Sequence, residues 1–134
     1  MPNAISWFEI PVLDLDRSKK FYETILATTL PVMRVGGTGP QLAVFPVEFS
    51  QGVGGALACG KGYQPAREIA GAREVQEGVK VYLNAGDDLG LVLARVEAAG
   101  GRIAVPKTQI SPEYGFMGAF VDTEGNWVGL HSVR

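Results

Sequence analysis

One pattern stands twice in this chain: Trp7-Phe8-Glu9-Ile10-Pro11-Val12 leads into Asp14-Leu15, and Lys80-Val81-Tyr82-Leu83 leads into Asp88-Leu89. The strand openings are 73 residues apart, from position 7 to position 80, and the Asp-Leu steps are 74 apart, from 14 to 88. Each copy continues into an amphipathic helix and three further strands. A duplicated unit can fold two sheets around one shared cleft, and a cleft is where we expect the function.

The first copy combines a β-branched, apolar strand over 5–12 with a helix that runs to Leu26. Asp14 is placed to cap this helix, because its carboxylate can accept hydrogen bonds from the free N–H groups of the first turn. Apolar residues from Leu15 to Leu26 recur on one face at helical spacing. We predict the three strands that follow over 31–35, 42–47 and 53–59.

The second copy repeats this order. Its helix is predicted from Leu89 to Ala99, and Gly100-Gly101 is expected to end it in a left-handed turn. The matching strands are predicted over 103–105, 115–122 and 126–132, with a hairpin over 123–126. We therefore divide the chain into a first module (1–62), a linker (63–78) and a second module (79–134), which together form one compact domain.

Composition excludes several classes of protein. The chain has 134 residues, a net charge of −2 and no basic patch, so nucleic acid is not an expected partner. Cys59 is the only cysteine, which excludes an internal disulfide and a thiolate metal cluster. Because the first residues lack the pattern of a signal peptide and no apolar run reaches the ~20 residues that cross a bilayer, we expect a cytoplasmic protein without membrane contact.

Two motifs carry a resemblance to a known family. The first is Val12-Leu13-Asp14-Leu15-Asp16-Arg17-Ser18 before Phe21-Tyr22, and the second is Phe120-Val121-Asp122-Thr123-Glu124-Gly125-Asn126 before Val128-Gly129-Leu130. Together with the duplication, the chain resembles the vicinal oxygen chelate superfamily of glyoxalase I, bleomycin resistance proteins and extradiol dioxygenases. The resemblance implies an α+β fold of two tandem βαβββ modules, with curved mixed sheets around a shared cleft. It also implies a homodimer with the cavity at or near the interface.

The metal-binding members imply four ligands, typically His, Gln or Glu, on the first and last strands of the two modules. Carried over to this chain, those positions fall on Trp7, Ala56, Lys80 and Gly129. Trp7, Ala56 and Gly129 offer no side-chain lone pair to a metal, and Lys80 would have to lose its proton against an unperturbed pKa near 10. We therefore expect no metal cofactor, which argues against the metal-dependent glyoxalase and dioxygenase reactions.

Strand alternation extends the candidate site, because each ligand position shares its face with the residue two places away. The predicted lining is Trp7, Glu9, Ala56, Ala58, Lys80, Tyr82, Gly129 and His131. Tyr114 and Phe116 are placed at the mouth of the cavity, or in core or interface packing. The ligand-binding candidates are Trp7, Glu9, Lys80, Tyr82, Tyr114, Phe116 and His131.

Structural alternatives remain open for the main candidates. Trp7 can fill the volume that the metal would occupy, Glu9 and Lys80 can form an ion pair between the modules, and His131 can be a hydrogen-bonded filler. Glu9 and His131 are also the candidates for catalytic roles.

Three functions follow from these alternatives. The first is a metal-independent protein that binds a small molecule in the cleft, with the bleomycin resistance proteins as its precedent. The second is a glyoxalase- or dioxygenase-type enzyme with a displaced metal, or with Glu9 and His131 as an acid–base pair. The third is a structural or partner-binding module whose cavity is plugged by Trp7. We favour the first, and expect binding rather than catalysis.

Overall fold

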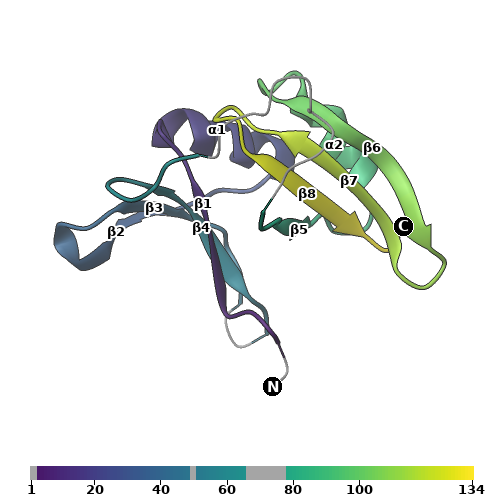
Figure 1. Ribbon diagram of the computed structural model, residues 1–134, viewed down its shortest axis with the longest axis horizontal. Coiled ribbons are helices and arrows are strands. Elements are labelled where there is room, and N and C mark those ends of the chain that lie inside the picture. Colours follow the sequence, from purple (N-terminus) through teal and green to yellow (C-terminus); the bar gives the residue numbers. More distant parts are fainter. Residues whose placement is uncertain (1–2, 49–50, 66–77) are drawn as a thin grey trace.

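The computed structural model describes residues 3–48, 51–65 and 78–134, which form two four-stranded sheets and two α-helices (Figure 1). The first sheet has the order β1-β4-β3-β2, and the second has the order β5-β8-β7-β6. The first strand of each module runs parallel to the last, and the other pairs are antiparallel. The first-sheet strands are β1 (Trp7–Pro11), β2 (Val32–Arg34), β3 (Gln41–Val44) and β4 (Gly54–Cys59). The second-sheet strands are β5 (Tyr82–Asn84), β6 (Arg102–Ser111), β7 (Gly115–Val121) and β8 (Trp127–Ser132).

The predicted fold class is confirmed: the protein is α+β, with two βαβββ modules and two mixed sheets. A short 3-10 turn, η1 (Val35–Gly37), occupies the glycine-rich segment between β2 and β3. Residues 66–77, which make up most of the predicted linker, lie outside the described residues. In the described part of the chain, no helix has both the length and the apolar character needed to cross a membrane.

Both helices begin at the leucine of their Asp-Leu step and are capped by its aspartate, as predicted for Asp14. In α1 (Leu15–Leu26), Asp14 Oδ1 accepts a hydrogen bond from the N–H of Arg17 at 3.0 Å. In α2 (Leu89–Val96), Asp88 Oδ1 accepts one from the N–H of Gly90 at 2.8 Å. The second helix ends earlier than predicted, and the chain then turns through Gly100 at φ +106°. Glycine suits this left-handed position because it has no Cβ to clash with the backbone.

The largest difference from the sequence prediction is the length of β6. The prediction over 103–105 stops before Pro106, whereas the strand runs from Arg102 to Ser111. Its pairing with β7 shifts register between Val105 and Thr108, so Pro106 lies where the ladder is interrupted. A bulge in an edge strand tolerates a residue without an N–H, which explains why the strand continues past the proline.

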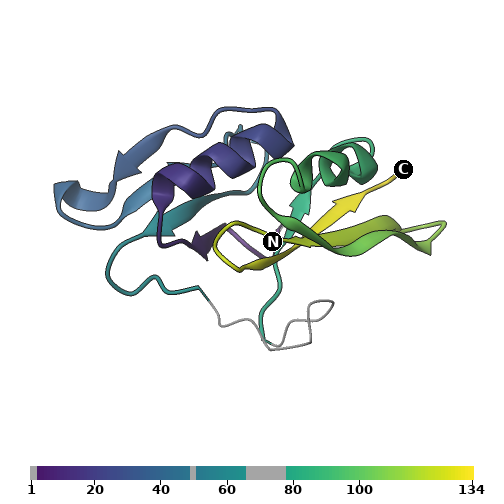
Figure 2. The same ribbon diagram turned by 90° about the horizontal axis from the view of Figure 1, so that it is seen from above.

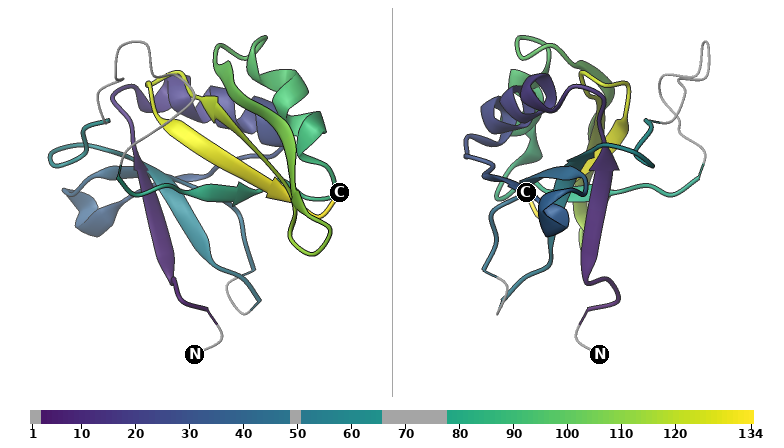
Figure 3. Two further views of the ribbon diagram at one scale, coloured as in Figure 1. Left: turned by 45° about the vertical axis from the view of Figure 1, so that its right-hand side comes forward. Right: turned by 90° about the vertical axis from the view of Figure 1, so that its left-hand side faces the viewer.

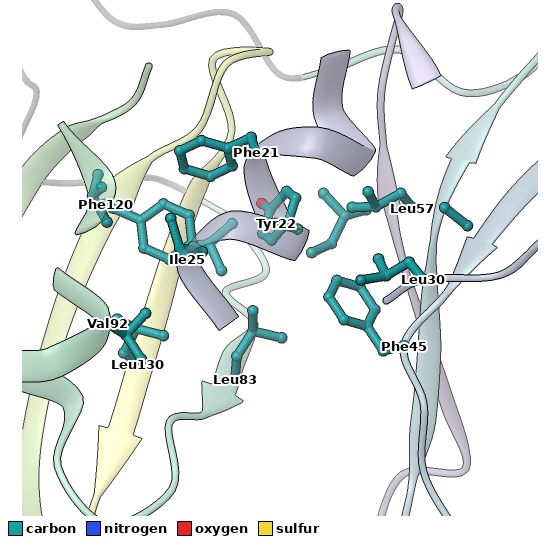
Figure 4. Close-up of a cluster of buried hydrophobic side chains, with 14 of the residues drawn as sticks. Phe21, Tyr22, Ile25, Leu30, Phe45, Leu57, Leu83, Val92, Phe120 and Leu130 are labelled. Carbon is teal, nitrogen blue, oxygen red and sulfur yellow. The ribbon is translucent and has the colours of Figure 1, made fainter. Parts of the chain in front are cut away.

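A single core joins the two modules. Figure 2 shows α1 and α2 as neighbours along one side of the molecule, and Figure 3 shows β1 beside β4 and β8 beside β7 in separate sheets. Phe21, Tyr22 and Ile25 on α1 lie between the two sheets, where they pack with residues of both (Figure 4). The Phe21 and Phe120 rings, from different modules, are 5.6 Å apart. Burial of these side chains holds the sheets in one relative position.

The hairpin between β7 and β8 also ties the second module to the first. The buried hydroxyl of Tyr22 donates to Asp122 Oδ2 at 2.7 Å, and Asn126 Nδ2 donates to the carbonyl of Pro11 at 2.8 Å. Glu124 Oε1 accepts hydrogen bonds from the backbone N–H groups of Leu13 and Asp14. We call Asp122, Glu124 and Asn126 the inter-module clasp.

Candidate functional site

Each sheet has one face packed against the helices and one face turned away from them, which we call its open face. On β1, Phe8 and Ile10 belong to the shared core, so Trp7 and Glu9 point to the open face. On β5, Leu83 belongs to the core, so Tyr82 points to the open face of the second sheet. Trp7, Glu9 and Tyr82 therefore lie on the open faces of their sheets.

The open face of the first sheet carries a carboxylate held by two aromatic residues. Glu9 Oε1 accepts a hydrogen bond from the Tyr63 hydroxyl at 2.5 Å, and Glu9 Oε2 accepts one from Trp7 Nε1 at 3.3 Å. Trp7 and Tyr63 pack beside the buried Ala56 and Ala58, which form the floor. Ala56 lies directly opposite Glu9 in the β1–β4 register. We call Trp7, Glu9 and Tyr63 the Glu9 cluster.

Tyr63 keeps its proton in this arrangement. The hydrogen bond that it donates to Glu9 raises the pKa of the Tyr63 hydroxyl, and desolvation and the charge of the carboxylate add to this effect. The phenol therefore acts as a neutral donor to Glu9 at physiological pH.

The open face of the second sheet carries an aromatic ring over a glycine. Tyr82 lies opposite Gly129 in the β5–β8 register, and a Cβ at position 129 would come within 2.4 Å of Tyr82 Cδ1. Real Cβ atoms do not approach ring carbons this closely, so a side chain at 129 requires Tyr82 to move. The Tyr82 ring thus takes the space that a longer residue at position 129 would use.

His131 is held on the same face by the backbone of the β6–β7 turn. Its Nε2 lies 2.6 Å from the carbonyl oxygen of Tyr114. A carbonyl only accepts hydrogen bonds, so Nε2 carries the proton and the neutral ring has its lone pair on Nδ1. In the neutral form of the ring, Nδ1 is therefore the atom that can accept a hydrogen bond.

A hollow of about 480 Å³ lies beside this histidine. Its walls are Tyr82, Ile110, Met117 and His131, three largely apolar side chains and one imidazole. A second hollow, of about 550 Å³, has walls from both modules, including Phe8, Phe45, Leu83 and Val92. The hollow between the modules thus lies on the core-facing side of the strands, and the hollow beside His131 lies on the open face.

Lys80 has an aromatic partner instead of an acidic one. Its Nζ lies 5.5 Å from the centre of the Trp127 ring, and that ring makes an edge contact with Tyr82 at 6.2 Å. Among the residues that the structure describes, Glu9 and Lys80 form no ion pair, so the structural alternative that joined them is wrong.

The two mouth candidates lie in different environments. The Tyr114 side chain is 67% exposed in the β6–β7 turn, and its backbone carbonyl holds His131. Phe116 packs against the shared core, with Lys107 Nζ 4.6 Å from the centre of its ring. The structure therefore brings Tyr82 together with His131 and Trp7 with Glu9, and places Phe116 on the core side of β7.

Four residues of these faces were not among the sequence candidates. Trp127 is two places before Gly129, so strand alternation would have found it. Ile110 was missed because the predicted β6 ended before it. Met117 on β7 was missed because, without the full β6, the register between the two strands could not be predicted. Tyr63 follows β4 in a segment without periodicity, so no sequence pattern pointed to it.

The positions that the family resemblance assigns to metal ligands do not carry the usual donor set of His, Gln and Glu. Trp7, Ala56 and Gly129 offer no lone pair, and position 129 has no room for a ligand side chain unless Tyr82 moves. Within residues 3–48, 51–65 and 78–134, no three side chains of His, Cys, Asp or Glu gather closely enough to hold an ion.

Comparison with solved structures shows the same fold in several glyoxalase-related proteins. A glyoxalase I mutant from Zea mays superposes with a TM-score of 0.65 at 22% identity, over 98% of this chain and 47% of that one. This chain thus spans about half the length of the maize protein. A glyoxalase/bleomycin resistance protein from Albidiferax ferrireducens T118 gives a TM-score of 0.62 at 18% identity, over 96% and 98% of the two chains. The trypanothione-dependent glyoxalase I from Leishmania major gives 0.62 at 19% identity, over 98% and 87%.

At these identities the likeness shows the fold alone. A comparison with curated proteins gave no match. A family model described as the Glyoxalase/Bleomycin resistance protein/Dioxygenase superfamily matches residues 4–130, nearly the whole chain. Together with the two βαβββ modules, this match establishes that the chain belongs to the Glyoxalase/Bleomycin resistance protein/Dioxygenase superfamily.

Proposed function

We propose that this protein binds a small molecule without a metal ion, on the open faces of its two modules. The observation that carries this proposal is the Tyr82 ring against Gly129, because it puts an aromatic surface where the metal-binding members have a ligand. The hollow beside Tyr82 and His131 combines apolar walls with one hydrogen-bonding ring, which is the usual make-up of a small-molecule site.

A homodimer is part of the proposal. Tyr82 is 47% exposed and Ile110 is 50% exposed on the open face of the second sheet. A second copy that lays its own open face against them would bury these side chains and enclose the ligand between two modules. The cytoplasmic location inferred from the sequence stays a prediction.

Ligand titrations of the protein test the binding site. We expect the aromatic probe p-cresol to shift the NMR signals of the His131 ring, with the same affinity in the presence and absence of a chelator. Ile110→Trp fills the hollow, so it should weaken binding by about tenfold or more. Leu91→Trp is the matched control, because Leu91 is 60% exposed on α2.

Two results would contradict the binding proposal. One is p-cresol binding that disappears when stoichiometric metal is removed. The other is an Ile110→Trp variant that binds as tightly as the Leu91→Trp variant. Sedimentation analysis checks the homodimer separately, and a monomer at all concentrations would remove that part of the proposal.

A second candidate is a glyoxalase- or dioxygenase-type enzyme with a displaced metal, or with Glu9 and His131 as an acid–base pair. The observation that favours it is the orientation of His131, whose Nδ1 holds the lone pair of a neutral imidazole. Glu9 lies on the other sheet with Trp7 and Tyr63, so a ligand would have to reach both open faces. Exchange of a proton next to a ketone for deuterium, lost in His131→Gln, would support this activity.

A further inference from the structure

In the described part of the chain, the Glu9 carboxylate has two hydrogen-bond donors and no cationic partner. Tyr63 and Trp7 donate to its two oxygens, and both donors are neutral. Among the described residues, no Lys, Arg or His side chain forms an ion pair with it. The negative charge of Glu9 is therefore held in a defined position without being neutralised.

The surroundings of this charge are aromatic and apolar. Trp7 and Tyr63 flank the carboxylate, and Leu42, Ala56 and Ala58 beneath them are buried. An apolar floor weakens the screening of a charge by water on that side. A carboxylate between Trp and Tyr rings attracts an organic cation in two ways, through its charge and through the electron-rich ring faces.

In the second sheet, the chain itself supplies both an ammonium group and the aromatic ring that it contacts. Lys80 corresponds to Trp7 in the repeat, and its ammonium group lies 5.5 Å from the centre of the Trp127 ring. In the first sheet, Trp7 and Tyr63 donate to the Glu9 carboxylate, and no Lys, Arg or His side chain within residues 3–48, 51–65 and 78–134 forms an ion pair with it. The two open faces thus carry opposite charges at related places: the first carries the Glu9 carboxylate and the second the Lys80 ammonium group.

We propose that the Glu9 cluster binds the ammonium group of a small organic cation. This inference rests on the proposed function, since it adds a chemical class to the ligand of the open faces. The two donors orient the Glu9 oxygens, and the remaining lone pairs of the carboxylate face the ammonium. Trp7 and Tyr63 contact its alkyl substituents.

Choline and its neutral carbon isostere, 3,3-dimethylbutan-1-ol, are the probes for this site. They have nearly the same shape and differ in charge. We expect choline to shift the indole N–H signal of Trp7, identified with the Trp7→Phe variant, and to bind about tenfold more tightly than the isostere. The Trp127 signal should stay in place.

Variants separate the charge from the shape of the site. Glu9→Gln keeps the size and the acceptor oxygen but removes the charge, so choline affinity should fall about tenfold while the weak binding of the isostere is unchanged. Tyr63→Phe should weaken choline binding as well, because the carboxylate loses the donor that orients it. Glu97→Gln removes an equal charge at an exposed position beyond the open faces and should have no effect.

Equal affinities for choline and the isostere would overturn the cation site, as would Glu9→Gln binding choline like the wild type. Titration of p-cresol on the same sample tests the proposed function separately from the cation site. A shift of His131 by p-cresol with no response of Trp7 to choline overturns the cation site alone. No response to either probe overturns both.

Discussion

Tyr22 is completely buried, yet its hydroxyl is paired with a carboxylate from the other module. Burial and the neighbouring Asp122 raise the pKa of the Tyr22 hydroxyl well above its usual range, so it stays a donor. Burial also raises the pKa of Asp122, although hydrogen bonds from Tyr22 and Asn126 oppose that rise. At the level of single residues, this pair is a fully buried polar link between the modules.

Tyr22→Phe should lower the free energy of unfolding by about 1.5–3 kcal/mol, because a buried carboxylate loses a donor while the ring packing is kept. Urea denaturation measures this change. Tyr114→Phe is the control, since the Tyr114 side chain is 67% exposed, and it should shift the free energy by less than about 0.5 kcal/mol. A Tyr22→Phe value as small as that of the control would mean that the hydroxyl contributes little.

At the scale of secondary-structure elements, the close approach of Tyr82 to Gly129 sets how β5 and β8 lie together. Gly129→Ala should cost about 1–3 kcal/mol, because the added methyl group overlaps the ring of Tyr82. Adding Tyr82→Ala should recover part of that loss, which a double-mutant cycle from thermal or urea unfolding measures. Gly52→Ala is the control, since its Cβ would make only ordinary contacts. Purely additive effects would show that the ring moves aside freely.

At the scale of the whole molecule, the shared core makes the two modules depend on each other. Phe120→Ala in the second module should lower the free energy of unfolding by about 3–5 kcal/mol, because Phe120 also packs with Phe21 and Tyr22 of the first. We expect one cooperative transition in the variant, detected alike by signals of Trp7 and Trp127. Separate transitions for the two tryptophans would show that the modules unfold independently.

The inter-module clasp should also make stability depend on pH. Burial raises the pKa of Glu124, but hydrogen bonds from Arg17, the N–H of Asp14 and Thr123 outweigh it, so the pKa lies below its ordinary value of 4.5. An acid whose pKa is lower in the folded state stabilises the fold above its unfolded pKa, and that stability is lost as the pH falls through the folded pKa.

Glu124→Gln should therefore be less stable than the wild type at pH 7, and should lose less stability on acidification below about pH 4.5. Asp122, whose pKa is raised, changes stability in the opposite direction, since its contribution falls as the pH rises through its folded pKa. Urea unfolding at several pH values measures both trends. Glu97→Gln, at an exposed position, should show the same dependence of the unfolding free energy on pH as the wild type. A Glu124→Gln variant with that same pH dependence would contradict the role of the clasp.

Local patterns of the sequence were sufficient to predict the two modules and the side of the sheet to which several strand residues point. The Asp-Leu steps predicted both helix starts because a cap depends on neighbouring residues, and alternation placed Trp7, Glu9 and Tyr82 on the open faces because a strand has a period of two. The same rules predicted that β6 ends before Pro106. The strand continues because the bulge that tolerates the proline arises only from pairing with β7.

Tertiary structure alone decided which of these residues meet. Tyr63 reaches Glu9 across 54 positions of sequence, Lys80 turns to Trp127 instead of Glu9, and the Tyr114 carbonyl orients His131. Alternation specifies the side of a sheet to which a side chain points. Its partners depend on how sheets and turns pack through the shared core, where contacts between distant residues leave no periodic trace in the sequence.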